Sequence, residues 1–492
     1  MVSLVPTRRP GRVARRAARR TAAACLVWLL FATPWATAQV DATTRAAVEF
    51  GLGGHLVAGA WNPLRVTVRD VGPSVLELRI DEGSLLTGPR LVRYRASLPG
   101  GSGVTVFDDD LYVPTFRNLS WTLTSGATVL ASASLGVGDS DARPLEVLLS
   151  SAPGNWRAAY AADARLVDIA ASDLPARVAA YDGVASILLD GSAAAPRPEA
   201  IAAAAAGGAQ VLLAGALPAS QAGLGSLAGD GRRRLGAGEV ARVAADSAAV
   251  RAAREGWRAP ERVALIQALA ADPLLAAPPG VGQPVVLSMA AAFVLIVLLG
   301  LRFGRAPGLA AALVLAALVP LAGWRLLRPP EPVLSGSHSV QLGGGALALT
   351  LDVEDRLTLP AGIVTVPTAG HPLTSRPYDV RDGVTEIALS RWHGVSVVLR
   401  PVLEPAELRF EGERLRNDGR EALTDVVVLG LGRQPDLAPG ASEALRRGEE
   451  GGLPPLLARL APLLPPGTAL ASGPSTVVIA LPPVVGVAGG EL

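Results

Sequence analysis

Polar side chains that could bind a ligand or act in catalysis follow two predicted strands of this 492-residue chain. Asp190 and Ser192 follow one apolar run, and Gly215 and Ser220 belong to the turn after the next run. A serine hydroxyl attacks an amide only when a general base lies within hydrogen-bond distance. None of the four histidines lies between residues 144 and 262. We therefore predict a ligand-binding crevice at these four residues and no catalytic residue.

Thiol and metal chemistry have little support in the sequence. The single cysteine, Cys25, lies in an apolar run near the amino terminus, and the chain after it has no thiol. Disulfides, thiolate metal sites and cysteine nucleophiles are therefore excluded there. Two acidic clusters remain, at residues 108–110 (DDD) and 139–141 (DSD). The second lacks the glycine and the distal glutamate of a calcium loop, and we expect the first to be solvated in a hairpin turn. The sequence predicts no metal site and no cofactor.

Three short apolar runs, at residues 145–149, 186–190 and 211–215, are predicted to form the strands that carry the crevice. They lack polar alternation, and an alanine-rich helix at 198–206 separates the last two. Continuous apolar strands with an intervening helix are typical of a parallel α/β sheet. Such a sheet binds ligands at the carboxyl ends of its strands, which is where the candidate residues lie.

Alternation of apolar and polar residues predicts antiparallel sheets on both sides of this region. It is clear at residues 64–69 and 75–80 before the region, and at 347–351 and 395–399 after it. Period two is the pattern of a strand with one buried face, and glycine and proline mark the turns. We predict one β-sandwich before the α/β region and a second one after it.

The first 38 residues have the order of a secretory signal peptide. Seven arginines precede an eleven-residue apolar core at 22–32, and Ala36, Thr37 and Ala38 supply the pattern of a cleavage site. An uncleaved membrane anchor is the alternative interpretation. Both interpretations place the residues that follow outside the cytoplasm.

Two uncharged segments predict a transmembrane hairpin at 284–324. Residues 285–301 and 306–324 contain seventeen and nineteen uncharged residues, and Arg302 and Arg305 lie between them. At about 1.5 Å per helical residue, each nearly covers a hydrocarbon core of about 30 Å. The two arginines fit a cytoplasmic turn, so the carboxy-terminal region is predicted to return outside. The alternative is a buried helical hairpin of a soluble domain. Neither segment carries an ionisable residue, which argues against an ion or proton pathway.

The charge balance gives no support for nucleic-acid binding. All 45 basic residues are arginines, and 7 of them lie in the first twenty positions, which leaves 38 against 43 acidic residues, or −5 for the rest of the chain. A basic surface is the electrostatic mark of a nucleic-acid-binding domain, and it is missing here. Nucleic acid is therefore not among the predicted partners.

Several short motifs, taken in order, resemble those of a family of bacterial membrane proteins with an extracytoplasmic class I glutamine amidotransferase-like domain. They are residues 59–68 (GAWNPLRVTV), 173–175 (DLP), 181–184 (YDGV), 206–209 (AGGA), 236–243 (GAGEVARV), 415–419 (LRNDG) and 423–428 (LTDVVV). The resemblance implies a flavodoxin-like α/β domain between β-sandwiches. It also implies an accessory role in an envelope complex with MoxR-type ATPases and von Willebrand A-domain proteins. Active members of the amidotransferase superfamily use a cysteine nucleophile, but the corresponding turn here contains only the hydroxyl of Ser220.

The predicted fold class is a multidomain α+β membrane protein, with most of the chain outside the cytoplasm at the cell membrane. The predicted units are a signal peptide (1–38), a β-sandwich (39–143), a degenerate amidotransferase-like domain (144–262), a linker (263–283), a transmembrane hairpin (284–324), a linker (325–339) and a C-terminal β-sandwich with a terminal helix and strand (340–492). The predicted function is that of a non-enzymatic, membrane-anchored interaction or scaffold protein of a bacterial envelope complex. The alternatives are a small-ligand sensor or hydrolase that uses the α/β crevice, and an accessory subunit of an ABC-type exporter.

Overall fold

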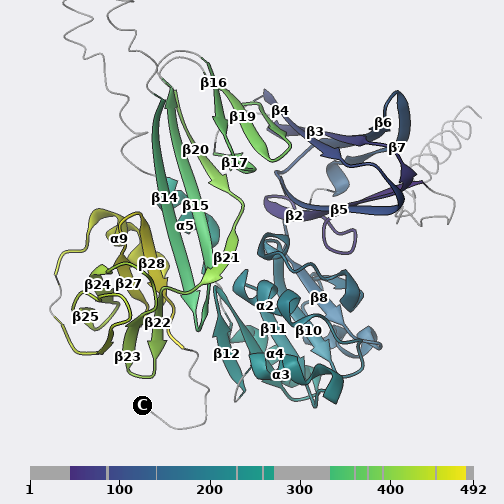
Figure 1. Ribbon diagram of the computed structural model, residues 1–492. Coiled ribbons are helices and arrows are strands. Elements are labelled where there is room, and N and C mark those ends of the chain that lie inside the picture. Colours follow the sequence, from purple (N-terminus) through teal and green to yellow (C-terminus); the bar gives the residue numbers. More distant parts are fainter. Residues whose placement is uncertain are drawn as a thin grey trace, which may run out of the picture.

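The protein is a multidomain, mostly β protein with several sheets, one of which is a mixed parallel sheet (Figure 1). The computed structural model describes residues 45–270 and 333–483, apart from gaps at 85–87, 140, 229–230, 258–259, 359–361, 374–375, 390–392 and 449–450. Within these ranges, no helix has both the length and the apolar character that a membrane crossing requires. The predicted signal peptide and the predicted transmembrane hairpin lie outside the described residues.

Two sheets enclose an apolar core at the amino-terminal end of the described chain. The first has the order β1 (Ala46–Phe50), β2 (Ala60–Val71) and β5 (Gly101–Val113). The second has the order β16 (Gly362–Val366), β19 (Val384–Leu389), β18 (Tyr378–Arg381), β4 (Gly88–Leu98), β3 (Ser74–Ser84), β6 (Asn118–Ser125) and β7 (Thr128–Gly136). Alternation decides the faces, because Leu64, Val66 and Val68 of β2 are buried while Arg65 and Thr67 between them are partly exposed.

Three strands of the second sheet, β16, β18 and β19, come from residues 362–389. Strand β18 pairs in parallel with β4, with Tyr378 opposite Val92 and Arg381 opposite Arg95. Val364 and Val380 are buried in the same core as residues of β2 and β3. Two segments nearly 290 residues apart in sequence therefore share one sheet, although the sequence analysis assigned them to two sandwiches. The predicted domain ranges stay predictions.

The mixed sheet confirms the expected parallel sheet. Its order is β12 (Arg232–Leu235), β13 (Gly238–Val243), β11 (Gln210–Ala214), β10 (Val184–Asp190), β8 (Leu145–Leu149) and β9 (Arg165–Asp168), with only β12 antiparallel to its neighbour. Helices α2 (Pro198–Ala206), α3 (Ala222–Leu227) and α4 (Ser247–Glu255) connect or flank the strands. Helix α2 begins at a proline in its first position and its last turn is followed by Gly207 and Gly208, as the sequence predicts.

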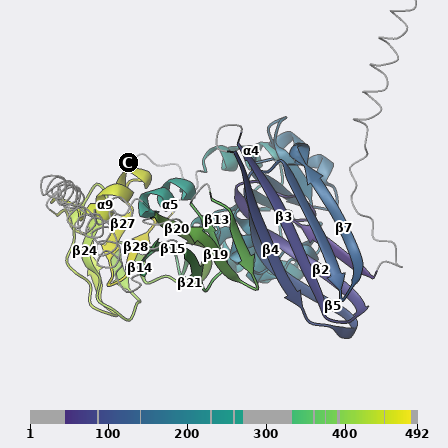
Figure 2. The same cartoon turned by 90° about the horizontal axis from the view of Figure 1, so that it is seen from above.

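A third group of strands extends from the middle of the molecule to the end opposite β3 and β7 (Figure 2). The largest sheet has the order β17 (Gly370–Pro372), β20 (His393–Leu399), β15 (Leu347–Thr358), β14 (Val333–Gly344), β28 (Thr476–Ala480), β27 (Ala469–Ser472), β24 (Thr424–Val428) and β25 (Gly432–Arg433), with β21 (Val402–Pro405) also paired to β15. Strands β15 and β20 lie in the middle of the molecule, and β24 and β27 lie at the end opposite β3 and β7 (Figure 2). A small sheet consists of β22 (Leu408–Glu411), β23 (Arg414–Asn417) and β26 (Ser442–Ala444). Helices α5 (Arg262–Ala270) and α9 (Pro455–Leu460) share an apolar core with β14, β15 and β28.

Candidate functional site

The predicted crevice lies where the order of the parallel strands changes direction. Strand β8 lies between β9 and β10, so its chain neighbour β9 lies on one side and the following strands lie on the other. Ligands of such sheets bind beside this point, at the carboxyl ends of the two central strands. Ser150 directly follows β8 and Asp190 is the last residue of β10. The fold therefore places Ser150 beside the predicted Asp190 and Ser192.

The carboxylate of Asp190 is the centre of a hydrogen-bond network at this edge. It accepts hydrogen bonds from the indole N–H of Trp156 (2.7 Å), from the backbone N–H of Ser192 (2.9 Å) and from the hydroxyls of Ser150 and Ser192. Burial raises the pKa of Asp190, but these hydrogen bonds together outweigh it and hold the pKa below its ordinary value. The carboxylate is ionised at neutral pH.

The two hydroxyls beside Asp190 are also occupied as acceptors. Ser150 Oγ accepts the backbone N–H of Ala152 at 3.0 Å, and Ser192 Oγ accepts the backbone N–H of Ser151 at 3.1 Å. A carboxylate with a low pKa that accepts four hydrogen bonds is a weak base. The same hydrogen bonds connect the loop after β8 to the loop after β10. This geometry supports a structural role better than general-base chemistry.

The other two predicted residues belong to the adjacent loop. Gly215 follows β11 with φ +74°, and its N–H donates to Val243 O at 2.9 Å. Ser220 lies in a short 3-10 turn, Ala219–Gln221. The side chain of Gln221 donates to Ala193 O at 2.9 Å, which joins this loop to the loop after β10. The two loops are thus neighbours, as the parallel sheet requires, and the binding of a ligand by the four residues stays a prediction.

Ser150 and Trp156 of this network were not predicted from the sequence. Ser150 follows the apolar run 145–149, so the rule that found Asp190 could also have found Ser150. Trp156 follows a 3-10 turn, Pro153–Asn155, and carries no signal in its spacing that relates it to Asp190.

The acidic run at residues 108–110 is not the solvated hairpin turn that the sequence suggested, because it lies within β5. Asp109 accepts hydrogen bonds from the Tyr94 hydroxyl at 2.5 Å and from Arg400 Nη1 at 2.7 Å. Asp110 is 1% exposed and accepts a hydrogen bond from Arg177 Nε at 2.9 Å. The run therefore connects β5 both to the mixed-sheet region and to the segment after β20.

A cavity of about 440 Å³ lies where these three parts of the chain meet. Its wall includes Trp61, Tyr112, His371 and Arg262. The rings of Tyr112 and His371 stack with centroids 3.7 Å apart, and Trp61 meets Tyr112 edge-on at 5.8 Å. Arg262 pairs with the carboxylate of Asp182 at 2.5 Å. This volume lies within the range of small-molecule sites, and such sites favour domain junctions.

Neither a metal site, in the part of the chain that the structure describes, nor a known family is found. Within the described residues, no group of three or more His, Cys, Asp or Glu side chains is arranged to hold a metal ion. No protein-family model matches the chain, and no curated protein matches it.

Proposed function

We propose that this protein is a membrane-anchored, non-enzymatic interaction or scaffold protein of a bacterial envelope complex, with the described residues outside the cytoplasm. In this proposal the amino-terminal and carboxy-terminal parts are β-sandwiches. The mixed sheet is a degenerate amidotransferase-like domain, and residues 284–324 form a two-helix transmembrane hairpin. The strand order β9-β8-β10-β11-β13 supports the middle assignment, because it is the flavodoxin-like order 2-1-3-4-5.

The observation that carries the proposal is the pairing of β4 with β18. These strands lie before and after residues 271–332 in the sequence, yet they are hydrogen-bonded neighbours in one sheet. Gly236 N also donates to Gly344 O at 3.0 Å, and Arg400 pairs with Asp109 at 2.7 Å. Both parts must therefore be on the same side of any membrane. A segment that begins and ends on one side crosses an even number of times, which agrees with the two predicted spans and an outside carboxy terminus.

The hydrogen bonds of Asp190 support the proposal that the protein is not an enzyme. Its carboxylate is engaged by four donors from within the chain, and residues 144–262 contain neither cysteine nor histidine. Amide hydrolysis on this fold needs a nucleophile with an adjacent base. We therefore favour binding over catalysis.

A small-ligand sensor is the second candidate, and the junction cavity favours it more than the crevice does. The cavity is lined by residues of all three parts, so an occupant would add contacts between them. This differs from the hydrolase or sensor that the sequence suggested at Asp190. The accessory role in an ABC-type exporter stays a prediction.

The test is a crosslinked pull-down of the full-length protein with a carboxy-terminal tag from native membranes, combined with protease treatment of intact spheroplasts. We expect a stoichiometric envelope partner, of which a MoxR-type or von Willebrand A-domain system is the first candidate, and a tag that the protease removes. A protected tag would contradict the outside carboxy terminus. Isolation of the protein alone would contradict the scaffold function and favour the ligand sensor.

A further inference from the structure

The outward face of the seven-stranded sheet carries a shallow groove lined by four arginines. The groove measures about 380 Å³. Arg79 belongs to β3, Arg93 and Arg95 belong to β4, and Arg381 belongs to β18. Two acidic residues, Glu77 and Asp379, are in the same lining, so its formal charge is 4 − 2 = +2.

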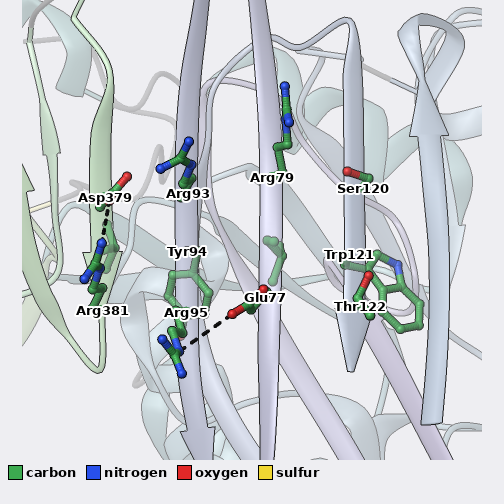
Figure 3. Close-up of a pocket in the computed structure, with 12 residues that line it drawn as sticks. Glu77, Arg79, Arg93, Tyr94, Arg95, Ser120, Trp121, Thr122, Asp379 and Arg381 are labelled. Carbon is green, nitrogen blue, oxygen red and sulfur yellow. Dashed lines mark hydrogen bonds and ion pairs between the residues drawn. The ribbon is translucent and has the colours of Figure 1, made fainter. Parts of the chain in front are cut away.

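Strand register places like charges directly opposite each other in this groove. Arg79 lies opposite Arg93 on one side and opposite Ser120 on the other. One row across the sheet therefore reads Asp379, Arg93, Arg79, Ser120, on four neighbouring strands (Figure 3). The next row places Arg95 opposite Arg381.

Both acidic side chains form their ion pairs with arginines of the second row, although Asp379 itself lies opposite Arg93 in the first row. Arg95 pairs with Glu77 at 3.8 Å, and Arg381 pairs with Asp379 at 3.0 Å (Figure 3). In the first row, Arg79 has one contact to Asp81 at 3.3 Å and is 61% exposed. Among the described residues, the guanidinium of Arg93 has neither an ion pair nor a hydrogen bond. The first row thus presents two guanidinium groups and a hydroxyl with most of their donors unused.

The stability of the sheet does not explain this row. Like charges directly opposite each other on neighbouring strands are destabilising, so the Arg79–Arg93 pair costs stability, although Asp379 lies opposite Arg93 on its other side. An oxyanion between Arg79 and Arg93 would remove the repulsion and fill both guanidinium forks.

We propose that Arg79, Arg93 and Ser120 form a binding site for a phosphate group. A carboxylate has only two oxygens, which lie in one plane and match the two parallel N–H groups of one arginine. A phosphate offers three or more oxygens in different directions. It can therefore accept hydrogen bonds from two guanidinium groups on separate strands and from a hydroxyl on a third strand. The phosphate belongs either to a soluble phosphate compound or to a phospholipid headgroup. This site lies on a different sheet from the Asp190 network and does not rest on the scaffold function.

The test uses the full-length protein in nanodiscs of zwitterionic lipid, titrated with inorganic pyrophosphate by calorimetry. We expect saturable binding that the double variant Arg79→Gln/Arg93→Gln weakens at least about tenfold and that added salt weakens further. Ser120→Ala should weaken it to a smaller extent. Arg69→Gln is the matched control, because it removes the same charge from the exposed face of β2 and should leave binding unchanged.

Nanodiscs that contain anionic phospholipid distinguish the two sources of phosphate. If headgroups occupy the row, pyrophosphate binding weakens in these discs for the wild type. If a soluble compound is the ligand, the affinity stays the same at constant ionic strength. Equal binding by the wild type and the double variant would overturn the proposal. So would binding of a polyglutamate peptide together with no binding of pyrophosphate, because that result would assign the face to an acidic protein partner. Each of these outcomes is independent of the pull-down and the tag assay.

Discussion

Removal of the Arg177 guanidinium is expected to destabilise the protein far more than removal of the Arg65 guanidinium, although the two ion pairs look alike. Arg177 pairs with Asp110 at 2.9 Å and Arg65 pairs with Asp108 at 3.0 Å, and both acids lie on β5. The difference is burial, because the Asp110 side chain is 1% exposed and the Asp108 side chain is 38% exposed. The two pairs therefore form a matched comparison within a single strand.

The magnitudes follow from the fate of the acid that loses its partner. In Arg177→Ala, Asp110 remains buried without its main counter-charge, and breaking a buried pair in this way typically costs about 3–5 kcal/mol. In Arg65→Ala, water replaces the arginine around Asp108, and the expected cost is at most about 1 kcal/mol. The double variant Asp110→Asn/Arg177→Ala should recover part of the loss, because it no longer buries a charge.

The loss in Arg177→Ala should also depend on pH. Burial raises the pKa of Asp110, and the interactions with Arg177 oppose that rise, so the variant raises the pKa further. The folded form then binds a proton more tightly than the unfolded form, whose pKa is about 3.9. Stability falls as pH rises from about 4 through the folded pKa, and acidification from pH 7 to pH 5 should restore part of it.

The assay is urea unfolding of the full-length variants in detergent, followed by tryptophan fluorescence at pH 7 and pH 5. We expect a large shift of the unfolding midpoint for Arg177→Ala that shrinks at pH 5, and a small shift for Arg65→Ala that changes little. Equal shifts for the two variants, or a shift for Arg177→Ala that does not change with pH, would refute the argument from burial.

Two further predictions concern the contact between Gly236 and Gly344 and the hydrogen-bond network of Asp190. A Cβ on Gly344 would lie 2.4 Å from Gly236 O. Gly344→Ala should therefore lower the midpoint of thermal unfolding and make the turn at Gly236 accessible to protease. Gly362→Ala is the control and should change neither, because no atom lies within 4 Å of its added Cβ. Asp190→Ala should lower stability by about 1–3 kcal/mol at pH 7, because the Trp156 indole N–H and the other donors lose their acceptor. The pKa of Asp190 is held below its ordinary value, so the stability that its carboxylate contributes is complete above about pH 4 and is lost as pH falls through the folded pKa. The free energies of unfolding of the wild type and the variant should therefore converge in acid.

The mixed sheet was the most predictable part of the fold because its signals are local. The apolar runs at 145–149, 186–190 and 211–215 correspond to β8, β10 and β11, with boundaries that differ by at most two residues. Helix α2 agrees with its predicted range of 198–206, since proline and glycine mark its two ends. The position of Asp190 at a strand end followed from the same local pattern.

The role of residues 108–110 could not be predicted from the sequence in the same way. Three consecutive acids look like a turn, because one acid in isolation is costly to bury. Here Arg177 and Arg400 supply the counter-charges, and they come from segments about 70 and 290 residues away. No sequence pattern within β5 predicts that these two arginines are its partners.

Composition and periodicity alone determined which residues face a core, where the parallel strands end, and that residues 144–262 lack a nucleophile with a histidine base. Only the tertiary structure decided that β18 pairs with β4, that Arg79 lies opposite Arg93, and that three parts of the chain enclose one cavity. The physical reason is that alternation specifies the buried face of a strand but not its neighbour. Every strand edge offers the same backbone donors and acceptors, and the choice among edges depends on packing between residues far apart in the chain.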